Sequence, residues 1–494
     1  MVQRFLLLLA LLCNFALAQN PKTDIRPAQT RRAAFFPYEI QAKTLPNGLQ
    51  VVVVPTPEFK DTVTYSTVVL AGSRNETQKG KTGLAHLFEH IMFRHEYGGK
   101  PGGYAGQIDR LGVYNNAWTD YDLTYYHPTT FTSNLLGSVQ RPDGSVPPLM
   151  ELESSRFKAL KLDRKTFEVE AGAVLGEYRR VFSDPAEKML EQLSPVAFPH
   201  HPYGHTVIGY PEDVENMPNA WDAAWEFYRN YYSPNDVAII VVGDVTPADI
   251  FAGVQKYYGD WQPSHPPEIP AEQPPTAPQS LHVKWDADVS PILMVGYHTP
   301  AMHPGTKETA VTMVLPELLV SRSAPLYQKL RYQKQTVTSF TIYPGSGGFP
   351  GTGGVIQATD PHLMLLESEL VLDRFRKEGQ KYVADVQNDM ITGADALKEF
   401  SKTPHAAQIL HVVKSKIRND FLGELDSTDN IAEHLAWYYR FNRDPNVFES
   451  LMQAIDSLSP KDVDEYAARY FVPQGRIVTT LWHDVAQPPA GEVK

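Results

Sequence analysis

The sequence predicts an α+β protein of two homologous domains, each with an antiparallel sheet and helices packed on one face of that sheet. Three observations lead to this prediction. Apolar patterns typical of strands and of helices are mixed without the regular spacing of βαβ units, which disfavours a parallel sheet. The strand and helix pattern of the first half returns in the second half. A proline-rich stretch separates the two halves.

The composition is that of an ordinary globular protein. The chain has 494 residues, 42% hydrophobic and 21% charged, and this length predicts two or three domains. Because the apolar content is high, intrinsic disorder is excluded as the general state of the chain. The net charge is −12, from 45 Lys and Arg against 57 Asp and Glu, and no basic run is present, so we expect no nucleic-acid partner.

The segment 1–18 is typical of a cleaved secretory signal peptide. Arg4 is followed by an apolar run at 5–12 and by Ala16-Leu-Ala18. The run is too short to span a membrane, which takes about 20 apolar residues, and an apolar helix of the fold is the alternative. We expect an exported protein, periplasmic in a Gram-negative host or secreted, with no membrane attachment after cleavage. Because the one cysteine, Cys13, lies in this segment, the mature chain must bind any metal through His, Asp or Glu.

The proline-rich stretch at 262–279 predicts a linker, because such composition behaves as an extended spacer. Each flanking part is long enough for a domain with its own core. The predicted division of the chain is a signal peptide at 1–18, an N-terminal extension at 19–38, a catalytic domain at 39–261, the linker at 262–279, an inactive homologous domain at 280–486 and a C-terminal tail at 487–494.

The predicted repeat can be followed element by element. Two strands and then a helix open each half, with strands at 48–54 and 62–70 in the first, and strands at 280–285 and 291–297 and a helix at 307–320 in the second. Each half ends on a tyrosine-rich helix end, a Pro turn and a strand that stops at Asp-Val. An internal duplication explains both similarities, and chance similarity of two strand–helix patterns is the alternative.

The segment His86-Leu-Phe-Glu89-His90 is the first candidate for chemistry. Its apolar neighbours fit a buried helix, on which His86 and His90 lie one turn apart on the same face and can both reach one Zn²⁺. Glu89 borders the same place and can take a proton from water. The order His-x-x-Glu-His is the inverzincin pattern. The alternative is an accidental pair of histidines, although a buried carboxylate beside two imidazoles would be costly without a ligand.

A tetrahedral zinc site needs a third protein ligand, and the segment 167–180 is its best source. Glu170 and Glu177 are seven residues apart, or two helical turns, so both point the same way. A solvated acidic face is the alternative. The residues between the two glutamates are mostly Ala, Gly, Val and Leu, which favours a buried face.

Together these segments resemble the family of the pitrilysin, insulin-degrading and mitochondrial processing peptidases over nearly the whole mature chain. The motifs that carry the resemblance are His86-Leu-Phe-Glu89-His90, Asn116-Ala-Trp-Thr119 with Asp122-Leu-Thr-Tyr125, Glu170-x-x-x-Val174-x-x-Glu177, His201-Pro-Tyr-Gly204 with Ile208-Gly209, and Tyr232-x-Pro234 leading to Val241-Val-Gly-Asp244. The resemblance implies a zinc metalloendopeptidase whose two domains face each other across a cleft. It also implies short or unfolded peptides as substrates.

The resemblance further implies roles for single residues. His86, His90 and Glu177 would be the ligands of one Zn²⁺ per chain, and Glu89 the general base. Glu170 would support catalysis by orienting a ligand or the motif helix. A substrate peptide would add as an extra strand to the edge strand that contains Asn116, Ala117, Trp118 and Thr119.

Two departures from the family pattern concern the rest of the chain. The separation between His90 and Glu177 is long, which we attribute to an inserted surface loop at 132–144. The second half has no metal motif, and the family there holds substrate through an Arg and, seven residues on, a Tyr. Arg331 stands at the first position, but Thr338 stands at the second.

Thr338 leaves three alternatives open. The chain is a self-sufficient peptidase; or it is a zinc-bearing subunit that takes its substrate contacts from a partner, as a homodimer or as a heterodimer with a family homologue; or it is a non-catalytic scaffold of the same fold. The intact His-x-x-Glu-His and Glu177 favour an enzyme, because a scaffold has no evident need for all four residues.

Overall fold

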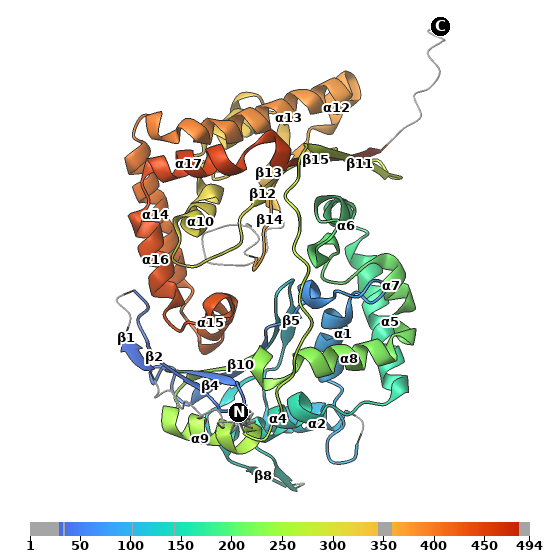
Figure 1. The fold of residues 1–494 in the computed structure, drawn as a ribbon, viewed down its shortest axis with the longest axis vertical. Helices are drawn as coiled ribbons and strands as arrows, with labels where there is room; N and C mark the ends of the chain where they lie inside the picture. The colour runs from blue at the N-terminus through green and yellow to red at the C-terminus, as the bar shows by residue number, and fades with distance from the viewer. Residues whose placement is uncertain (1–28, 33–34, 101, 143, 344–357, 484–494) are drawn as a thin grey trace, which may run out of the picture.

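The computed structural model of the chain describes residues 29–32, 35–100, 102–142, 144–343 and 358–483. The predicted signal peptide, most of the predicted N-terminal extension and the predicted C-terminal tail lie outside these residues. The chain forms two halves, each with one large sheet and its own helices (Figure 1). This mixed architecture of sheets and many helices in two domains confirms the predicted fold class.

The first half is built on an eight-stranded sheet. The strand order is β1-β2-β3-β10-β4-β6-β5, and β7 also pairs with β4. The central strands β3 and β10 are runs of Val and Ile that are buried on both faces. The strands are β1 (Gln29–Arg32), β2 (Glu39–Thr44), β3 (Gln50–Pro55), β4 (Thr62–Val69), β5 (Ala117–Thr119), β6 (Thr124–Tyr126), β7 (Thr129–Phe131) and β10 (Val237–Gly243).

The second half is built on a five-stranded sheet with the order β11-β15-β12-β14-β13. Its strands are β11 (Gln279–Trp285), β12 (Ile292–Thr299), β13 (Val337–Tyr343), β14 (His362–Leu370) and β15 (Arg476–His483). The first sheet repeats this order in β3-β10-β4-β6-β5, so both place the first, last, second, fourth and third strand of the repeat side by side. The shared order supports the predicted duplication.

The expectation of purely antiparallel sheets is wrong for one strand pair in each half. β10 runs parallel to β3, with Val241 opposite Val53, and β15 runs parallel to β11, with Leu481 opposite Val283. The other pairs in both sheets are antiparallel. A parallel pair needs a long crossover connection, and in each half the helices between the first and the last strand supply it.

The helices of the first half pack on one face of its sheet, as predicted. Phe88, Val174 and Tyr231, from three different helices, share a buried cluster with Val241 of the sheet. The helices are α1 (Leu84–Met92), α2 (Gly103–Leu111), α3 (Ser133–Leu136), α4 (Leu149–Ala159), α5 (Arg164–Val181), α6 (Pro185–Ala197), α7 (Pro211–Asn216), α8 (Trp221–Tyr231) and α9 (Pro247–Tyr258).

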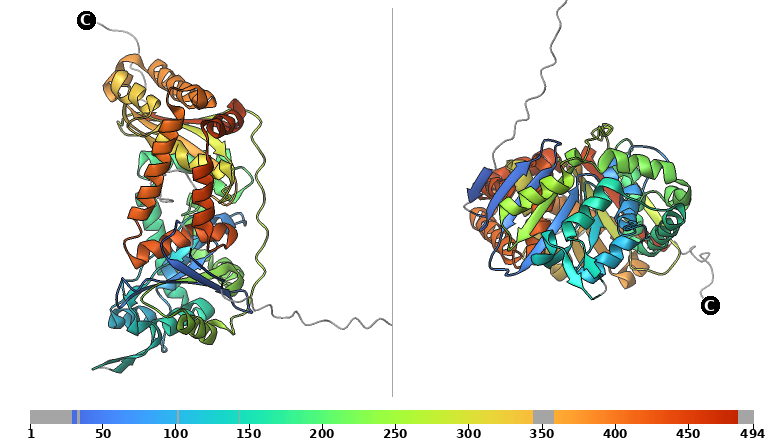
Figure 2. Two further views of the ribbon diagram at one scale, coloured as in Figure 1. Left: turned by 90° about the vertical axis from the view of Figure 1, so that its left-hand side faces the viewer. Right: turned by 90° about the horizontal axis from the view of Figure 1, so that it is seen from below.

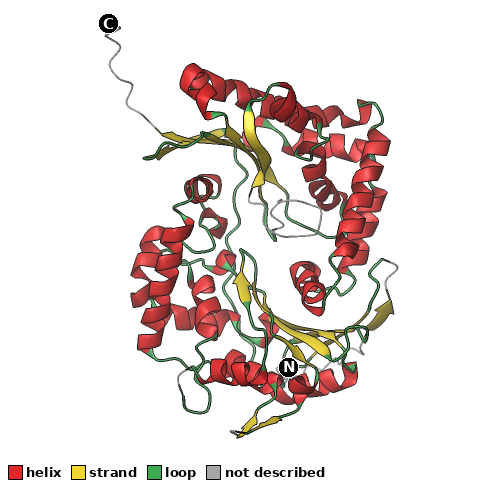
Figure 3. Cartoon of the chain, turned by 180° about the vertical axis from the view of Figure 1, so that it is seen from behind, coloured by secondary structure: helices red, strands yellow, loops and turns green. Residues whose placement is uncertain are grey.

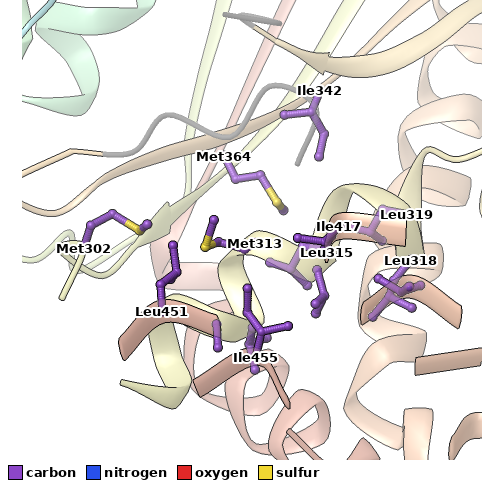
Figure 4. Packing of buried hydrophobic residues seen from close by; sticks show 14 of the residues in the cluster. Met302, Met313, Leu315, Leu318, Leu319, Ile342, Met364, Ile417, Leu451 and Ile455 are labelled. Atoms are coloured by element: carbon purple, nitrogen blue, oxygen red, sulfur yellow. The ribbon is translucent and has the colours of Figure 1, made fainter. Parts of the chain in front are cut away.

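The helices of the second half pack around a buried cluster that continues into the first half. Met313 and Leu315 of the first helix in this half lie with Leu451, Ile455 and Met364 in one buried cluster (Figure 4). The helices are α10 (Lys307–Leu319), α11 (Pro325–Tyr327), α12 (Leu372–Glu378), α13 (Gln380–Asp395), α14 (Ala406–Gly423), α15 (Thr428–Asn442), α16 (Val447–Ser457) and α17 (Pro460–Tyr470).

One helix of each half packs on the sheet of the other half. α6 lies against β11 and β15, where Met189 and Leu193 share a buried cluster with Leu481. α15 lies against β4 and β10, where Ile431 belongs to the same cluster as Ile240. Figure 3 shows both helices between the two sheets. The two halves are therefore joined by a reciprocal exchange of helices, and each sheet gains apolar cover on the face turned away from its own helices.

Two further segments connect the halves. Phe35 and Phe36 precede β2, yet they stack on Phe421 and Phe448 of the second half, with ring centroids 5.2 Å apart in both pairs. The backbone N–H of Phe35 donates to Oε2 of Glu449 at 2.9 Å. The predicted linker has no helix or strand at 262–278, and it runs along the outside of both halves (Figure 2).

The predicted insertion at 132–144 contains α3 and most of a small separate hairpin. The hairpin pairs β8 (Val139–Arg141) with β9 (Gly144–Val146) and lies apart from both large sheets (Figure 1). A surface position explains why the added residues leave the large sheet intact. In the part of the chain that the structure describes, no helix is both long enough and apolar enough to cross a membrane.

Candidate metal centre

Helix α1 begins in a tightly enclosed turn. Gly83 has a φ of 84°, and a Cβ at this position would lie 2.2 Å from the carbonyl oxygen of Ile208, so only glycine fits. The buried carboxylate of Glu76 accepts hydrogen bonds from the backbone N–H groups of Gly83, at 2.7 Å, and Ala85, at 2.6 Å. These bonds satisfy free donors at the start of the helix and fix where α1 begins.

The two histidines of α1 point to α5. Leu87 and Phe88 are fully buried in the core of the first half, which sets the rotation of the helix. His86 and His90 then lie on the same side, with ring centroids 4.9 Å apart. This agrees with the helical spacing predicted from the sequence.

Glu177 of α5 completes a group of three possible ligands. Its Oε2 lies 3.6 Å from Nε2 of His86 and 3.5 Å from Nε2 of His90. Both distances exceed the roughly 2.7–3.2 Å of a hydrogen bond. Ligand atoms held about 2.0–2.2 Å from a tetrahedral zinc ion lie about 3.3–3.6 Å from one another. The spacing therefore fits a shared zinc ion.

The protonation of His86 also fits a metal ligand. Burial, followed by the neighbouring His90, lowers the pKa of His86 to about 4, so this imidazole is neutral at pH 7. Only a neutral imidazole can donate a lone pair to a metal. Its buried Nδ1 has no hydrogen-bond partner among the described residues, and its Nε2 is the atom that faces Glu177.

Glu170 lies on the other side of His90. Its Oε2 is 3.7 Å from Nδ1 of His90, and its Oε1 accepts a hydrogen bond of 2.8 Å from Nε of Arg94. Glu170 is the main cause that raises the pKa of His90. Burial alone would raise the pKa of Glu170, but His90 and Arg94 outweigh it and lower that pKa. A proton held on Nδ1 leaves Nε2 of His90 free for a metal.

Glu89 is placed beside the metal cluster and in contact with the edge strand. Its Oε2 accepts a hydrogen bond of 2.7 Å from Oγ1 of Thr119. Burial raises the pKa of Glu89 to about 7, against the lowering effect of Thr119. A carboxylate with a pKa near neutrality both accepts and returns a proton readily at that pH.

The predicted edge strand lies at the edge of the first sheet. β5 covers Ala117, Trp118 and Thr119, and its one neighbour in the described sheet is β6. Asn116 directly precedes it, and its carbonyl oxygen accepts a hydrogen bond from the backbone N–H of His127. The strand packs against α1, so the structure brings the predicted substrate strand to the predicted metal ligands (Figure 1).

Among the described residues, no hydrogen bond joins Arg331 to the three proposed metal ligands or to β5. It lies in a π-helical turn at Gln328–Gln333 and donates to the carbonyl oxygen of Val337 at 3.2 Å. Thr338 lies on β13, the edge strand of the second sheet, and its hydroxyl donates to the carbonyl oxygen of Glu369. The substrate-binding role of Arg331 stays a prediction.

Three residues of this region were not predicted from the sequence. Arg94 follows His90 by four residues, and this spacing is the signal that could have identified it as a partner on the same face. Trp437 and Glu433 of α15 contact Trp118 from the second half. No spacing in the sequence indicates that contact, because only the packing of the two halves brings Trp437 and Glu433 to Trp118.

Two family models match the chain. The one described as "Insulinase (Peptidase family M16)" matches residues 51–210, which include the three clustered residues and Glu89. The one described as "Peptidase M16 inactive domain" matches residues 222–390. The second match begins in α8 of the first half and continues past the proline-rich segment.

Similar proteins are found among characterised sequences. The chain is 26% identical over 444 residues to the zinc protease PqqE of Helicobacter pylori, covering 87% of this chain and 90% of that protein. It is 26% identical over 256 residues to the mitochondrial-processing peptidase subunit beta of Blastocladiella emersonii, covering 49% of this chain and 50% of that protein.

Solved structures with the same fold include a protease from Helicobacter pylori. That structure has a TM-score of 0.75 and 24% identity and covers 90% of this chain and 99% of its own. Pitrilysin has a TM-score of 0.68 and 18% identity, covering 92% of this chain and 46% of the pitrilysin chain. At these identities the two structures establish the fold.

Proposed function

Because the chain belongs to the M16 family of peptidases, we propose that it is an exported zinc metalloendopeptidase that hydrolyses short or unfolded peptides. The observation that carries the proposal is the convergence of His86, His90 and Glu177 at ligand spacing, with Glu89 beside them. We assign these three residues as ligands of one Zn²⁺ per chain. The zinc protease from Helicobacter pylori, similar over most of its length, supports the choice of metal.

The proposed chemistry divides between the metal and the chain. When bound, zinc would supply Lewis-acid polarisation of the scissile carbonyl and lower the pKa of a nearby water. Glu89 would accept a proton from the attacking water and pass it to the leaving nitrogen as the C–N bond breaks. Thr119 holds one carboxylate oxygen of Glu89 by a hydrogen bond, so Oε1 remains for the proton. Glu170 would orient His90.

Substrate would bind by pairing with β5. An extended peptide beside Ala117, Trp118 and Thr119 would form backbone hydrogen bonds on the unpaired side of the strand. Such pairing depends on backbone hydrogen bonds rather than on particular side chains. It favours unfolded segments, because their backbone groups are free to pair. Because Thr119 is hydrogen-bonded to Glu89, the scissile bond of a peptide paired with β5 would lie beside the metal ligands.

Export rests on the N-terminal sequence. The apolar run at 5–12 and the Ala16-Leu-Ala18 site support a cleaved signal peptide, with the mature protein in the periplasm or outside the cell. We keep the division into a catalytic domain at 39–261 and an inactive domain at 280–486 as part of this proposal.

The test is cleavage of an unstructured fluorogenic peptide library by the purified chain. Glu89→Gln is expected to keep zinc and lose activity by about 10²–10⁴-fold, since that is the usual contribution of a general base. A chelator is expected to abolish cleavage, and added zinc to restore it. A Glu89→Gln variant as active as the natural chain would overturn the mechanism.

A partner-dependent peptidase is the second candidate. Two observations favour it: Thr338 occupies the expected tyrosine position, and one relative is named as a subunit of a processing peptidase. In that case a zinc-loaded chain would cleave nothing alone and gain activity with a homologue that carries the Arg and Tyr pair. Activity of the purified chain alone would reject this candidate. A chain that neither binds zinc nor gains activity would be a scaffold.

A further inference from the structure

We propose that Trp437, on α15 of the second half, is a positioning residue for Glu89 and acts on it through the edge strand β5. The inference rests on the proposed function, in which Glu89 is the general base. It gives the second half a role in catalysis that needs no metal ligand and no contact with substrate.

Strand β5 needs support from outside its sheet. It is three residues long and pairs with β6 through Ala117, Trp118 and Thr119. Side chains alternate between the two faces of a strand, so Thr119 and Trp118 point to opposite sides. Thr119 contacts α1, and Trp118 contacts α15. Whatever fixes Trp118 therefore also fixes the height of Thr119 above α1.

The Thr119 side of the strand holds the catalytic carboxylate. The hydroxyl of Thr119 donates to Oε2 of Glu89 at 2.7 Å, which is a normal length for a hydrogen bond to a charged oxygen. The bond selects one orientation of the carboxylate, and a shift of β5 would lengthen or lose it.

The Trp118 side is clamped by the second half. The ring of Trp437 stacks on that of Trp118, with centroids 4.8 Å apart and planes 21° apart. The carboxylate of Glu433 lies beside both tryptophan side chains, which lower its pKa against the larger raising effect of burial. The guanidinium of Arg440 covers Trp437 at 4.8 Å from its ring centre. Trp437 is thus held between an indole, a cation and a carboxylate, which leaves it little freedom.

Helix α15 is itself fixed to the first sheet. Ile431 and Leu435 are fully buried in a cluster that includes Ile240 of β10. Asp429 lies 2.9 Å from Nδ1 of His127, which stacks on Tyr125 of β6. The position of the second half therefore determines, through Trp437, where β5 lies. Through Thr119 it also determines where Glu89 lies. A misplacement of about 1 Å at a reacting group can cost about 100-fold in rate.

The test compares variants along this path in the full chain, with kcat, KM and zinc content measured for each. Trp437→Leu is expected to lower kcat by about 10–100-fold. KM is expected to stay within about threefold and zinc at one per chain, because the metal ligands are unchanged and the backbone groups of β5 can still pair with a peptide. Trp437→Phe keeps a stacking ring and is expected to recover most of the loss.

A double variant tests the path itself. Thr119→Val removes the hydroxyl and is expected to lower kcat by a similar factor. If Trp437 acts through Thr119, Trp437→Leu adds little to Thr119→Val. The matched control is Thr428→Val, which removes another contact between α15 and the first sheet at Thr64, away from β5. Thr64 keeps Thr129 as a partner, so this control is expected to keep the natural kcat.

Three outcomes would overturn the inference: a natural kcat in Trp437→Leu, full additivity in the double variant, or the same loss in Thr428→Val. If Trp437→Leu does not fold, Glu433→Gln, which keeps the stack and removes the charge beside it, is expected to lower kcat, and an unchanged kcat overturns the inference. A natural chain without Glu89-dependent cleavage would instead overturn the proposed function, so the two failures are distinguishable.

Discussion

Arg94 donates from Nε to Oε1 of Glu170 at 2.8 Å, while the other oxygen of the same carboxylate faces Nδ1 of His90 at 3.7 Å. Glu170 is therefore held in place by a cation on one side and turned to a proposed metal ligand on the other. Arg94 is half-exposed, but Glu170 is buried. An uncharged replacement would lose the charge that strengthens both interactions.

We predict that Glu170→Gln lowers zinc affinity by about 10–100-fold, the usual effect of removing a residue that orients a ligand. The measurement is competition for zinc against a chelator of known affinity. Glu168→Gln is the control, since Glu168 lies on the same helix with about half of its side chain exposed and pairs only with Arg164 among the described residues. Equal affinity in the two variants would reject an orienting role for Glu170.

Zinc should stabilise the natural chain but not a chain without Glu177. A ligand that binds only the folded state stabilises it by about 4 kcal/mol at 1,000 times its Kd. We predict that adding zinc to metal-stripped protein raises the melting temperature, and that Glu177→Ala and His86→Ala abolish the rise. An undiminished rise in either variant would place the metal elsewhere.

His362 should make the fold sensitive to mild acid. It is buried between the halves against Tyr203 and Phe198, and burial lowers its pKa to about 3. Below about pH 6.5 the unfolded chain binds a proton on this histidine while the folded chain does not, so stability falls with pH until about pH 3. The slope is about 1.4 kcal/mol per pH unit, or about 2 kcal/mol at pH 5.

The matching variant is His362→Phe, which keeps an aromatic ring. It is expected to show a smaller fall in the denaturation midpoint between pH 7 and pH 5 than the natural chain. An identical pH dependence in the two proteins would mean that His362 is already charged in the folded state or is open to solvent.

Asp360 should contribute to the contact between the halves. Its carboxylate accepts hydrogen bonds from Nε2 of His201 at 3.0 Å and from Nε of Arg74, both in the first half. These partners outweigh the effect of burial and lower the pKa of Asp360 to about 2. We predict that Asp360→Ala destabilises the chain by about 1–3 kcal/mol, because it leaves Arg74 and His201 without this partner.

The control for that variant is Asp373→Ala, at a carboxylate whose side chain is 82% exposed. Thermal midpoints of the two variants and the natural chain are compared above pH 5, where the aspartate of the unfolded chain is also charged. A loss confined to Asp360→Ala supports the interface, and equal midpoints would contradict it.

The sequence predicts the long strands of the first half and the two histidines of the metal cluster because their signals are local. The predicted strand at 62–70 corresponds to β4, and the helix at 307–320 to α10, each within one or two residues. His86 and His90 share a face because helical geometry requires it. The choice of Glu177 rather than Glu170 as the third ligand required the family resemblance, since the spacing between α1 and α5 has no local signature.

What the sequence does not predict depends on contacts between distant segments. The parallel pair β3 and β10 requires knowing that the last strand of the repeat inserts beside the first. The stack of Trp118 on Trp437 joins the two halves through residues that are more than three hundred positions apart in the sequence. Neither contact follows from a periodic pattern, because each is decided by how completed elements pack.

The exchange of helices has a consequence for biosynthesis. β4 and β10 leave the ribosome long before α15, the helix that covers their apolar face. Until α15 has been translated, the nascent first half presents an uncovered apolar surface, and surfaces of this kind invite aggregation. A chain truncated before Thr428 would keep that surface permanently. The full chain can therefore complete its fold only after almost the whole polypeptide has been synthesised.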